Sequence, residues 1–227
     1  MSEPLDDKVL RAAGLQLQGV VNTVDSSEAL PESALKYRQL LIFGHLGSVL
    51  WDALPRPIIS ANPFEEYSIQ QVTDFLARHR CDDYQFLYPS NDLFVDLRGL
   101  GKRLGWQHVS KLGIGIHPVL GTWFAYRVVV AANTCFETTS PDATESPCLS
   151  CSDKPCVAAC PVGAVQEEGN FNLQACMEQR LKPDSSCADR CVAREACPVG
   201  GEYRYGREQI AFHSAQSLRS LREFAES

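Results

Sequence analysis

The order of apolar and polar residues over the first part of the chain predicts a mixture of helices and short strands. Apolar positions three and four residues apart predict helices, and short apolar runs that end at Gly or polar residues predict strands. Asp6 or Asp7 caps the first predicted helix, and Ser68 is a suitable N-cap for a later one. The predicted helices span residues 6–14, 46–54, 68–80 and 97–104, and the predicted strands span residues 37–43, 84–88, 111–116 and 122–132. This mixture indicates an α+β or α/β fold.

A single shift in composition divides the chain. Residues 138–147 are rich in Ser, Thr and Pro and have no apolar period, as is typical of a linker. A mixed pattern precedes this stretch, and a cysteine-rich segment follows it. We therefore expect two domains, at residues 1–138 and 139–227, in a chain of 227 residues.

The charge of the chain argues against nucleic acid or an anionic membrane as a partner. Asp and Glu number 28 against 21 Lys and Arg, which gives a net charge of −7. The acidic excess is present on both sides of residue 140, so neither half offers the basic field that neutralises phosphates. The longest apolar run, residues 128–132, is far shorter than the ~20 residues of a membrane-spanning helix. The first residues are acidic, unlike a signal peptide, so we expect a cytoplasmic protein.

Ten cysteines are the unusual feature of the composition, and eight of them lie between Cys148 and Cys197. In a reducing compartment such a group indicates metal ligands or redox groups before disulfides. Cys81 and Cys135 stand apart from the group, and we interpret them as small buried apolar residues.

The first cysteine motif has the form C-x2-C-x4-C-x3-C-P. Its members are Cys148, Cys151, Cys156 and Cys160, followed by Pro161. Bacterial ferredoxins with two clusters use C-x2-C-x2-C-x3-C-P, in which the fourth cysteine ligates the other cluster. Three thiolates on a tight loop can hold one face of a [4Fe–4S] cube, and the fourth then points toward a second cube.

A second set of four cysteines follows, and it ends in the same way as the first. Its members are Cys176, Cys187, Cys191 and Cys197. Residues 160–163 and 197–200 both read Cys-Pro-Val-Gly, which suggests an internal duplication. By the ferredoxin pattern, Cys197 completes the set of Cys148, Cys151 and Cys156, and Cys160 joins Cys176, Cys187 and Cys191. Zinc is the alternative, but its usual paired C-x2-C knuckles lack the repeated Cys-Pro ending seen here.

Residues 100–124 add a resemblance to a known family. They contain a Leu104-Gly105-Trp106 turn, an apolar segment, and the turn His117-Pro118-Val119-Leu120-Gly121-Thr122-Trp123-Phe124. This order, followed by ferredoxin cysteines, resembles the cobalamin-binding and ferredoxin domains of epoxyqueuosine reductase. The corrinoid-dependent reductive dehalogenases have a related layout. The resemblance covers roughly residues 35–200 and does not include a helical-repeat domain for tRNA.

The resemblance implies a fold and a cofactor. The fold is a flavin-reductase-like (nitroreductase-like) α+β sandwich followed by a ferredoxin-like domain with two [4Fe–4S] clusters. The second cofactor is a cobalamin, with His117, Gly121 and Trp123 as residues that would contact it. Trp123 is also explained as a core residue, as are Trp106 and Phe124.

The acid that serves as proton donor in the family has no aligned counterpart. Asp92 and Asp96 are candidates for this role, and His117 is a further catalytic candidate. A helix cap or a solvated acid is the alternative interpretation of each aspartate.

Three classes of function follow. The first is an oxidoreductase whose clusters pass electrons to a corrinoid or a small-molecule substrate in the first domain, with a redox partner protein as electron donor or acceptor. The second is a free-standing electron carrier, or a protein that binds or processes cobalamin. The third is a structural or regulatory protein whose clusters stabilise the fold or sense oxygen.

Overall fold

The computed structural model describes residues 2–26, 30–141 and 144–226. Residue contacts divide the chain into two units. The first unit comprises Met1–Trp106 and Phe124–Ala143, and the second comprises Gln107–Trp123 and Thr144–Ser227. Part of the predicted linker, residues 142–143, lies outside the described residues.

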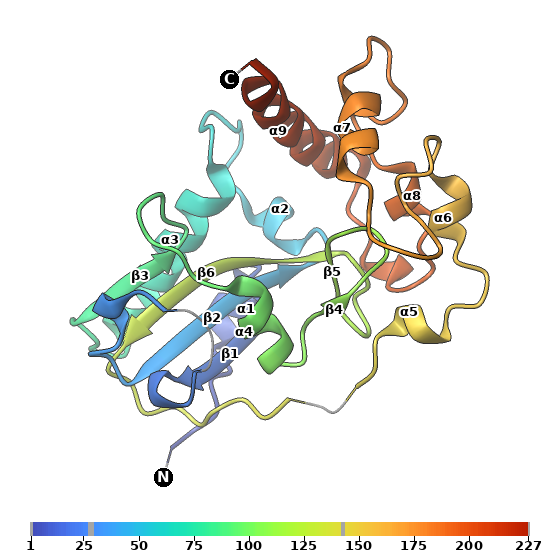
Figure 1. Ribbon diagram of the computed structural model, residues 1–227. Helices are drawn as coiled ribbons and strands as arrows, with labels where there is room; N and C mark the ends of the chain where they lie inside the picture. Colours follow the sequence, from blue (N-terminus) through green and yellow to red (C-terminus); the bar gives the residue numbers. More distant parts are fainter. Residues whose placement is uncertain (1, 27–29, 142–143, 227) are drawn as a thin grey trace. The chain divides into compact units, whose positions relative to one another are not determined.

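A four-stranded antiparallel sheet forms the centre of the first unit (Figure 1). Its strands are β1 (Leu17–Asn22), β2 (Gln39–Leu46), β3 (Tyr84–Tyr88) and β6 (Phe124–Ala132), in the order β1-β2-β6-β3. The two central strands are almost continuously apolar because neither of their faces meets water. Helices α1 (Lys8–Ala12), α2 (Val49–Ala53), α3 (Pro63–Arg78) and α4 (Leu97–Arg103) complete this unit.

Both faces of the sheet are covered by apolar side chains. On one face Leu100 and Trp106, on and after α4, belong to a buried cluster with Ile42 and Val129. On the other face Phe75 of α3 makes an edge-on contact with Phe43, with ring centroids 5.8 Å apart. A polar group buried in such a sheet requires a hydrogen-bond partner.

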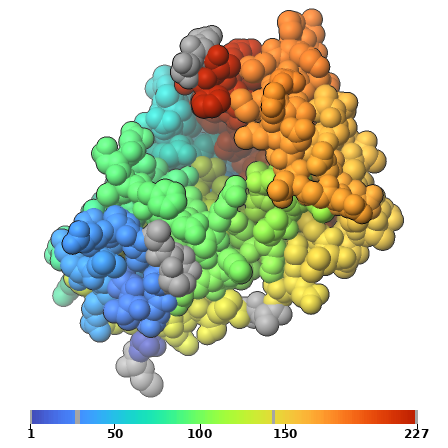
Figure 2. All heavy atoms as spheres, viewed as in Figure 1, coloured from blue at the N-terminus to red at the C-terminus, as the bar shows by residue number. Residues whose placement is uncertain are grey.

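The second unit is made of short helices and loops with one small hairpin. The hairpin pairs β4 (His108–Val109) with β5 (Gly115–Ile116). The helices are α5 (Pro147–Ser150), α6 (Pro155–Ala159), α7 (Leu173–Leu181), α8 (Val192–Glu195) and α9 (Arg207–Glu226). Single 3-10 turns occur in the described part of the chain at Thr23–Asp25, Glu32–Ala34 and Gly201–Tyr203. The orange surface in Figure 2 belongs to this unit.

Side-chain hydrogen bonds hold α9 against α7. Arg180 of α7 donates to the carbonyl oxygen of Ser214 at 3.0 Å and to the Ser217 hydroxyl at 2.9 Å. A small core of Leu112, Val165 and Ala193 lies beneath the loops. Of the helices that the structure describes, none combines the length and apolar composition needed to cross a bilayer.

The structure corrects two predicted elements and adds one strand. Helix α3 begins at Pro63, with Glu65 and Glu66 in its first turn, whereas Ser68 is buried inside the helix and does not cap it. The predicted strand at 111–116 is reduced to Gly115–Ile116, because Ser110 binds the carbonyl oxygen of Ile114 and closes a turn. The edge strand β1 was not expected from the sequence.

The division by contacts also differs from the expected division at residue 138. Residues 107–123 group with the cysteine-rich unit although they precede β6. The guanidinium of Arg194 donates to the hydroxyl and the carbonyl oxygen of Thr122, which accounts for the association. The residues around His117 are therefore part of the second unit.

Candidate functional site

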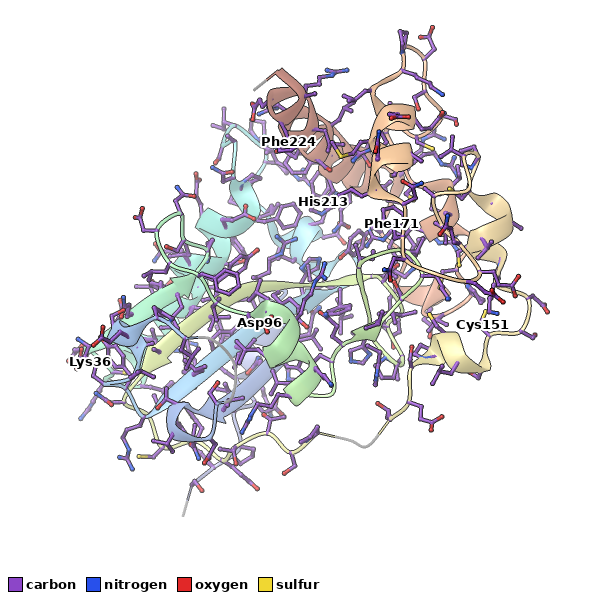
Figure 3. All side chains as sticks on the ribbon, viewed as in Figure 1. Lys36, Asp96, Cys151, Phe171, His213 and Phe224 are labelled. Atoms are coloured by element: carbon purple, nitrogen blue, oxygen red, sulfur yellow. The ribbon has the colours of Figure 1, made fainter. Side chains whose placement is uncertain are left out.

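Four thiols from the two sequence motifs interact with one another around α5 and α6. Burial, followed by the charges of Cys197 and Cys148, raises the pKa of Cys156 above its usual value. Burial also raises the pKa of Cys197, and the neighbouring charges of Cys148 and Cys151 add to this effect. The structure thus brings Cys197 to the cysteines of the first motif. Figure 3 shows Cys151 on the segment between α5 and α6.

The remaining four thiols form a second group. The pKa of Cys176, on α7, is raised by burial and by the charges of Cys191, Cys160 and Cys187. Burial raises the pKa of Cys191 as well, with a contribution from Cys187. Among the described residues, no three His, Cys, Asp or Glu side chains converge closely enough to hold a single metal ion.

The second group surrounds a cavity of about 390 Å³ inside the second unit. Cys160, Cys176, Cys187 and Cys191 all line it, together with apolar side chains such as Leu112, Val165 and Phe171. Polar residues of α7 and α9 also line it, among them Arg180 and His213. Figure 3 labels His213 and Phe171 beside α9 and α7. A largely apolar cavity with four thiols suits a group that is held by sulfur and shielded from water.

Cys160 differs from its partners in its environment. Burial by itself would raise the pKa of its thiol. Backbone N–H groups of Val162 and of the three residues that follow it donate to the sulfur and lower the pKa below its usual value. The turn after Pro161, with Gly163 at φ 63°, aims these amides at one atom. Such an arrangement stabilises a thiolate, the form that binds iron.

His117 closes the turn in which it lies. Its Nδ1 accepts hydrogen bonds from the backbone amides of Val119 and Leu120, at 3.1 and 3.2 Å. Its backbone amide also donates to the carbonyl oxygen of Gly121 at 2.7 Å. Burial, with a smaller contribution from His108, lowers the pKa of the imidazole to about 4. The ring is thus neutral at physiological pH and caps the turn.

Gly121 and Trp123 are also engaged within the second unit. A Cβ at Gly121 would overlap the carbonyl oxygen of Val199 and lie 2.8 Å from its carbonyl carbon. The indole of Trp123 is fully buried, with the Arg194 guanidinium 4.3 Å above its ring and Tyr205 edge-on at 5.3 Å. Each of the expected cobalamin contacts His117, Gly121 and Trp123 thus makes packing or hydrogen-bond contacts within the second unit. Packing explains Trp123, as it explains the buried Trp106 and Phe124.

The two candidate acids have ordinary surroundings. Asp96 is the N-cap of α4, since its side chain accepts from the amide of Gly99 at 2.9 Å. Its charge, after burial, contributes to the raised pKa of Tyr126. Asp92 is exposed in the loop before α4. Neither position distinguishes these aspartates as proton donors.

A buried polar group in the first unit was missed by the sequence analysis. Arg127 lies at a bulge of β6, where the register with β2 shifts between Phe43 and Gly44. Its Nε donates to Nδ1 of the fully buried His45 at 2.9 Å, and its Nη1 lies 3.4 Å from Glu65 of α3. Bulges re-aim side chains in this way near functional sites. The detectable signal was an arginine inside an otherwise apolar run.

Comparison with solved structures assigns the fold. No protein-family model and no curated protein sequence matches the chain. Epoxyqueuosine reductase from Bacillus subtilis matches with a TM-score of 0.52 and 16% identity, over 88% of this chain and 66% of the reductase. Its counterpart from Streptococcus thermophilus matches with a TM-score of 0.52 and 14% identity, over the same shares.

A catabolic reductive dehalogenase solved with 3-bromo-4-hydroxybenzoic acid matches over 92% of this chain, with a TM-score of 0.52 and 12% identity. The chain spans about two thirds of the reductases and 33% of this dehalogenase. Over about nine tenths of its length, the chain has the fold of epoxyqueuosine reductases and reductive dehalogenases.

Proposed function

We propose that this protein is an electron-transfer protein that holds two [4Fe–4S] clusters in its second unit. One observation carries the proposal: the eight cysteines between Cys148 and Cys197 form two groups of four, and each group takes members from both sequence motifs. The ligands are Cys148, Cys151, Cys156 and Cys197 for one cluster, and Cys160, Cys176, Cys187 and Cys191 for the other. Four thiolates are the usual ligand set of a [4Fe–4S] cluster.

The surroundings of the thiols suit this cofactor. The raised pKa of Cys156, Cys176, Cys191 and Cys197 reflects burial and mutual repulsion of thiolates, which bound iron would relieve. The amides of residues 162–165 and the guanidinium of Arg180 lie around the second group. Hydrogen bonds to sulfur and exclusion of water are the means by which a protein adjusts a cluster's reduction potential. A redox partner protein that supplies or accepts electrons is part of the proposal.

Anaerobically purified or reconstituted protein is expected to contain about eight iron atoms and about eight sulfides per chain, as two cubes require. Iron and sulfide analysis, with metal analysis for zinc, measures this directly. EPR spectroscopy of the reduced protein should show two interacting paramagnetic clusters. A content of about four irons, or of zinc in place of iron, contradicts the two-cluster assignment.

A corrinoid as the electron acceptor is the narrower part of the proposal. Its support is the fold. The chain shares this fold with a reductive dehalogenase whose structure suggests a mechanism for B12-dependent dehalogenation. The turn residues His117, Gly121 and Trp123 do not contribute to that support, because each has a structural role in the second unit. A substrate held by the first unit, or no bound acceptor at all, is the alternative.

Titration with cob(II)alamin under anaerobic conditions tests this part by itself. If a corrinoid binds, its spectrum is expected to shift toward the form in which the nucleotide base has left the cobalt. An unchanged spectrum at saturating protein, with iron and sulfide content intact, would identify an electron carrier. That second function is favoured by the observation that Gly121 and Trp123 of the turn are buried in the second unit, where Gly121 lies against Val199.

A further inference from the structure

Two cysteines outside the cluster motifs line the same surface hollow of the first unit. Cys81 and Cys135 border this hollow of about 340 Å³ together with His79 and Phe136. The interpretation of both as small buried residues is wrong, because Cys135 is exposed and Cys81 is only partly covered. Their common location requires a different explanation.

The end of α3 fixes the position of Cys81. Arg80 has a left-handed backbone, with φ 53°, directly after the helix. Its amide donates to the carbonyl oxygen of Ala77, and the amide of Cys81 donates to that of Leu76. These two bonds make a Schellman motif, which holds the second residue beyond the helix end against the last turn. Cys81 is that residue.

Cys135 is fixed through the residues on either side of it. The amide oxygen of Gln39 accepts from the Thr134 hydroxyl at 2.8 Å and from the Phe136 amide at 3.0 Å. The Phe136 ring packs against Phe75, at 6.0 Å, and against His79, at 5.4 Å. The segment that carries Cys135 therefore lies against the end of α3.

The pairing of β3 with β6 ends close to both cysteines. Tyr84 of β3 pairs with Ala132 of β6, and Cys81 and Cys135 lie in the segments just before β3 and just after β6. The side chains of Asp83 and Asn133 do meet, at 3.4 Å. The Asn133 backbone also donates to the Cys81 sulfur, so the segment that carries Cys135 passes beside Cys81.

The two sulfurs have different surroundings. The pKa of Cys81 is raised, chiefly by burial and further by the charges of Asp82 and Asp83. A hydrogen bond from the Asn133 backbone opposes this effect only in part. Cys135, in contrast, is exposed, and Nη1 of Arg38 donates to its sulfur at 3.2 Å. An accessible sulfur beside a cation is the one expected to react first, and a shielded neighbour then resolves the product.

We propose that Cys81 and Cys135 are a reversible redox pair, which a low-molecular-weight disulfide such as oxidised glutathione converts into an intramolecular disulfide. The Cys135 thiolate attacks one sulfur of the reagent, a mixed disulfide forms, and the first thiol leaves with one proton. The Cys81 thiolate then attacks the Cys135 sulfur, the mixed disulfide breaks, and the second thiol leaves. Two cysteine hydrogens and two electrons pass to the reagent, which becomes two thiols.

The test uses the anaerobic holoprotein, treated with oxidised glutathione, alkylated and digested for peptide mapping. The wild-type protein is expected to yield a linked pair of peptides containing Cys81 and Cys135, with no lasting glutathione adduct, and dithiothreitol should restore both thiols. Cys81→Ser should retain glutathione on Cys135. Cys135→Ser should react at least about tenfold more slowly, because the shielded thiol is then the only attacking group of the pair. The double variant is the matched control.

Stable glutathione adducts on both cysteines of the wild-type protein, or no reaction at either, would overturn the pair. Peptide mapping reports each cysteine separately, so this result is independent of the cluster proposal. If the clusters were absent, the eight other cysteines would appear as additional alkylated or oxidised peptides. The linked peptides containing Cys81 and Cys135 would still be detected, or not, independently of those eight cysteines.

Discussion

Replacing Cys148 and Cys160 together by Ala is expected to remove both iron–sulfur clusters, although the two residues belong to one sequence motif. Replacing Cys160 and Cys191 together should remove only one, although they belong to different motifs. The reason is the grouping of thiols in the structure, where Cys160 interacts with Cys176 and lines a cavity with Cys191. The charge of Cys148 contributes instead to the raised pKa of Cys156 and of Cys197.

Iron content separates the two arrangements. The Cys148→Ala/Cys160→Ala variant should retain close to no cluster iron, and the Cys160→Ala/Cys191→Ala variant about four irons per chain. If the four cysteines of each sequence motif held one cluster, the first variant would retain about four irons and the second close to none. Cys81→Ser and Cys135→Ser, which lie in the first unit, are the controls and should leave the iron content unchanged. Loss of a whole cluster in either control would show that a different set of cysteines serves as ligands.

The spacing of the cysteines by itself predicts two sets of four cluster ligands, and this assignment stays a prediction for the iron analysis of the variants. A C-x3-C-P ending directs its cysteine away from the preceding three in any fold that carries it. Local rules also identified the paired strand β3 and the Asp96 cap of α4. Each of these features depends on residues close together in the chain.

Features that depend on distant contacts were not predictable in the same way. Strand β1 is an edge strand with Gly19 in its interior, where leucine and tryptophan side chains approach closely, so its apolar period is weak. The turn at His117 resembled part of a cofactor site in sequence, but its role is fixed by Val199, which lies some 80 residues later. The proximity of Cys81 and Cys135 follows from the pairing of β3 with β6, which the sequence does not display.

Gly121→Ala is expected to lower the stability of the second unit by about 2–5 kcal/mol. Its φ of 62° costs an L-residue about 1–2 kcal/mol, and the new methyl group would overlap the Val199 carbonyl, which adds about 1–3 kcal/mol. Because that oxygen is backbone and Gly200 packs equally tightly against Leu120, neither segment can move aside without separating the turn from the cysteine loop.

Alanine variants at two other glycines of the same unit separate the backbone cost from the cost of the overlap. Gly163 has nearly the same φ, 63°, and a methyl group there would meet no atom within 4 Å, so Gly163→Ala should show the backbone cost of about 1–2 kcal/mol alone. Gly201→Ala has neither problem and should change stability by less than about 0.5 kcal/mol. Thermal unfolding of the anaerobic holoprotein, followed by circular dichroism, should show a fall of roughly 4–20 °C for Gly121→Ala, larger than the fall for Gly163→Ala. If Gly121→Ala unfolded at the temperature of Gly163→Ala, the turn would not be packed against Val199, and Gly121 would again be open to a bound cofactor.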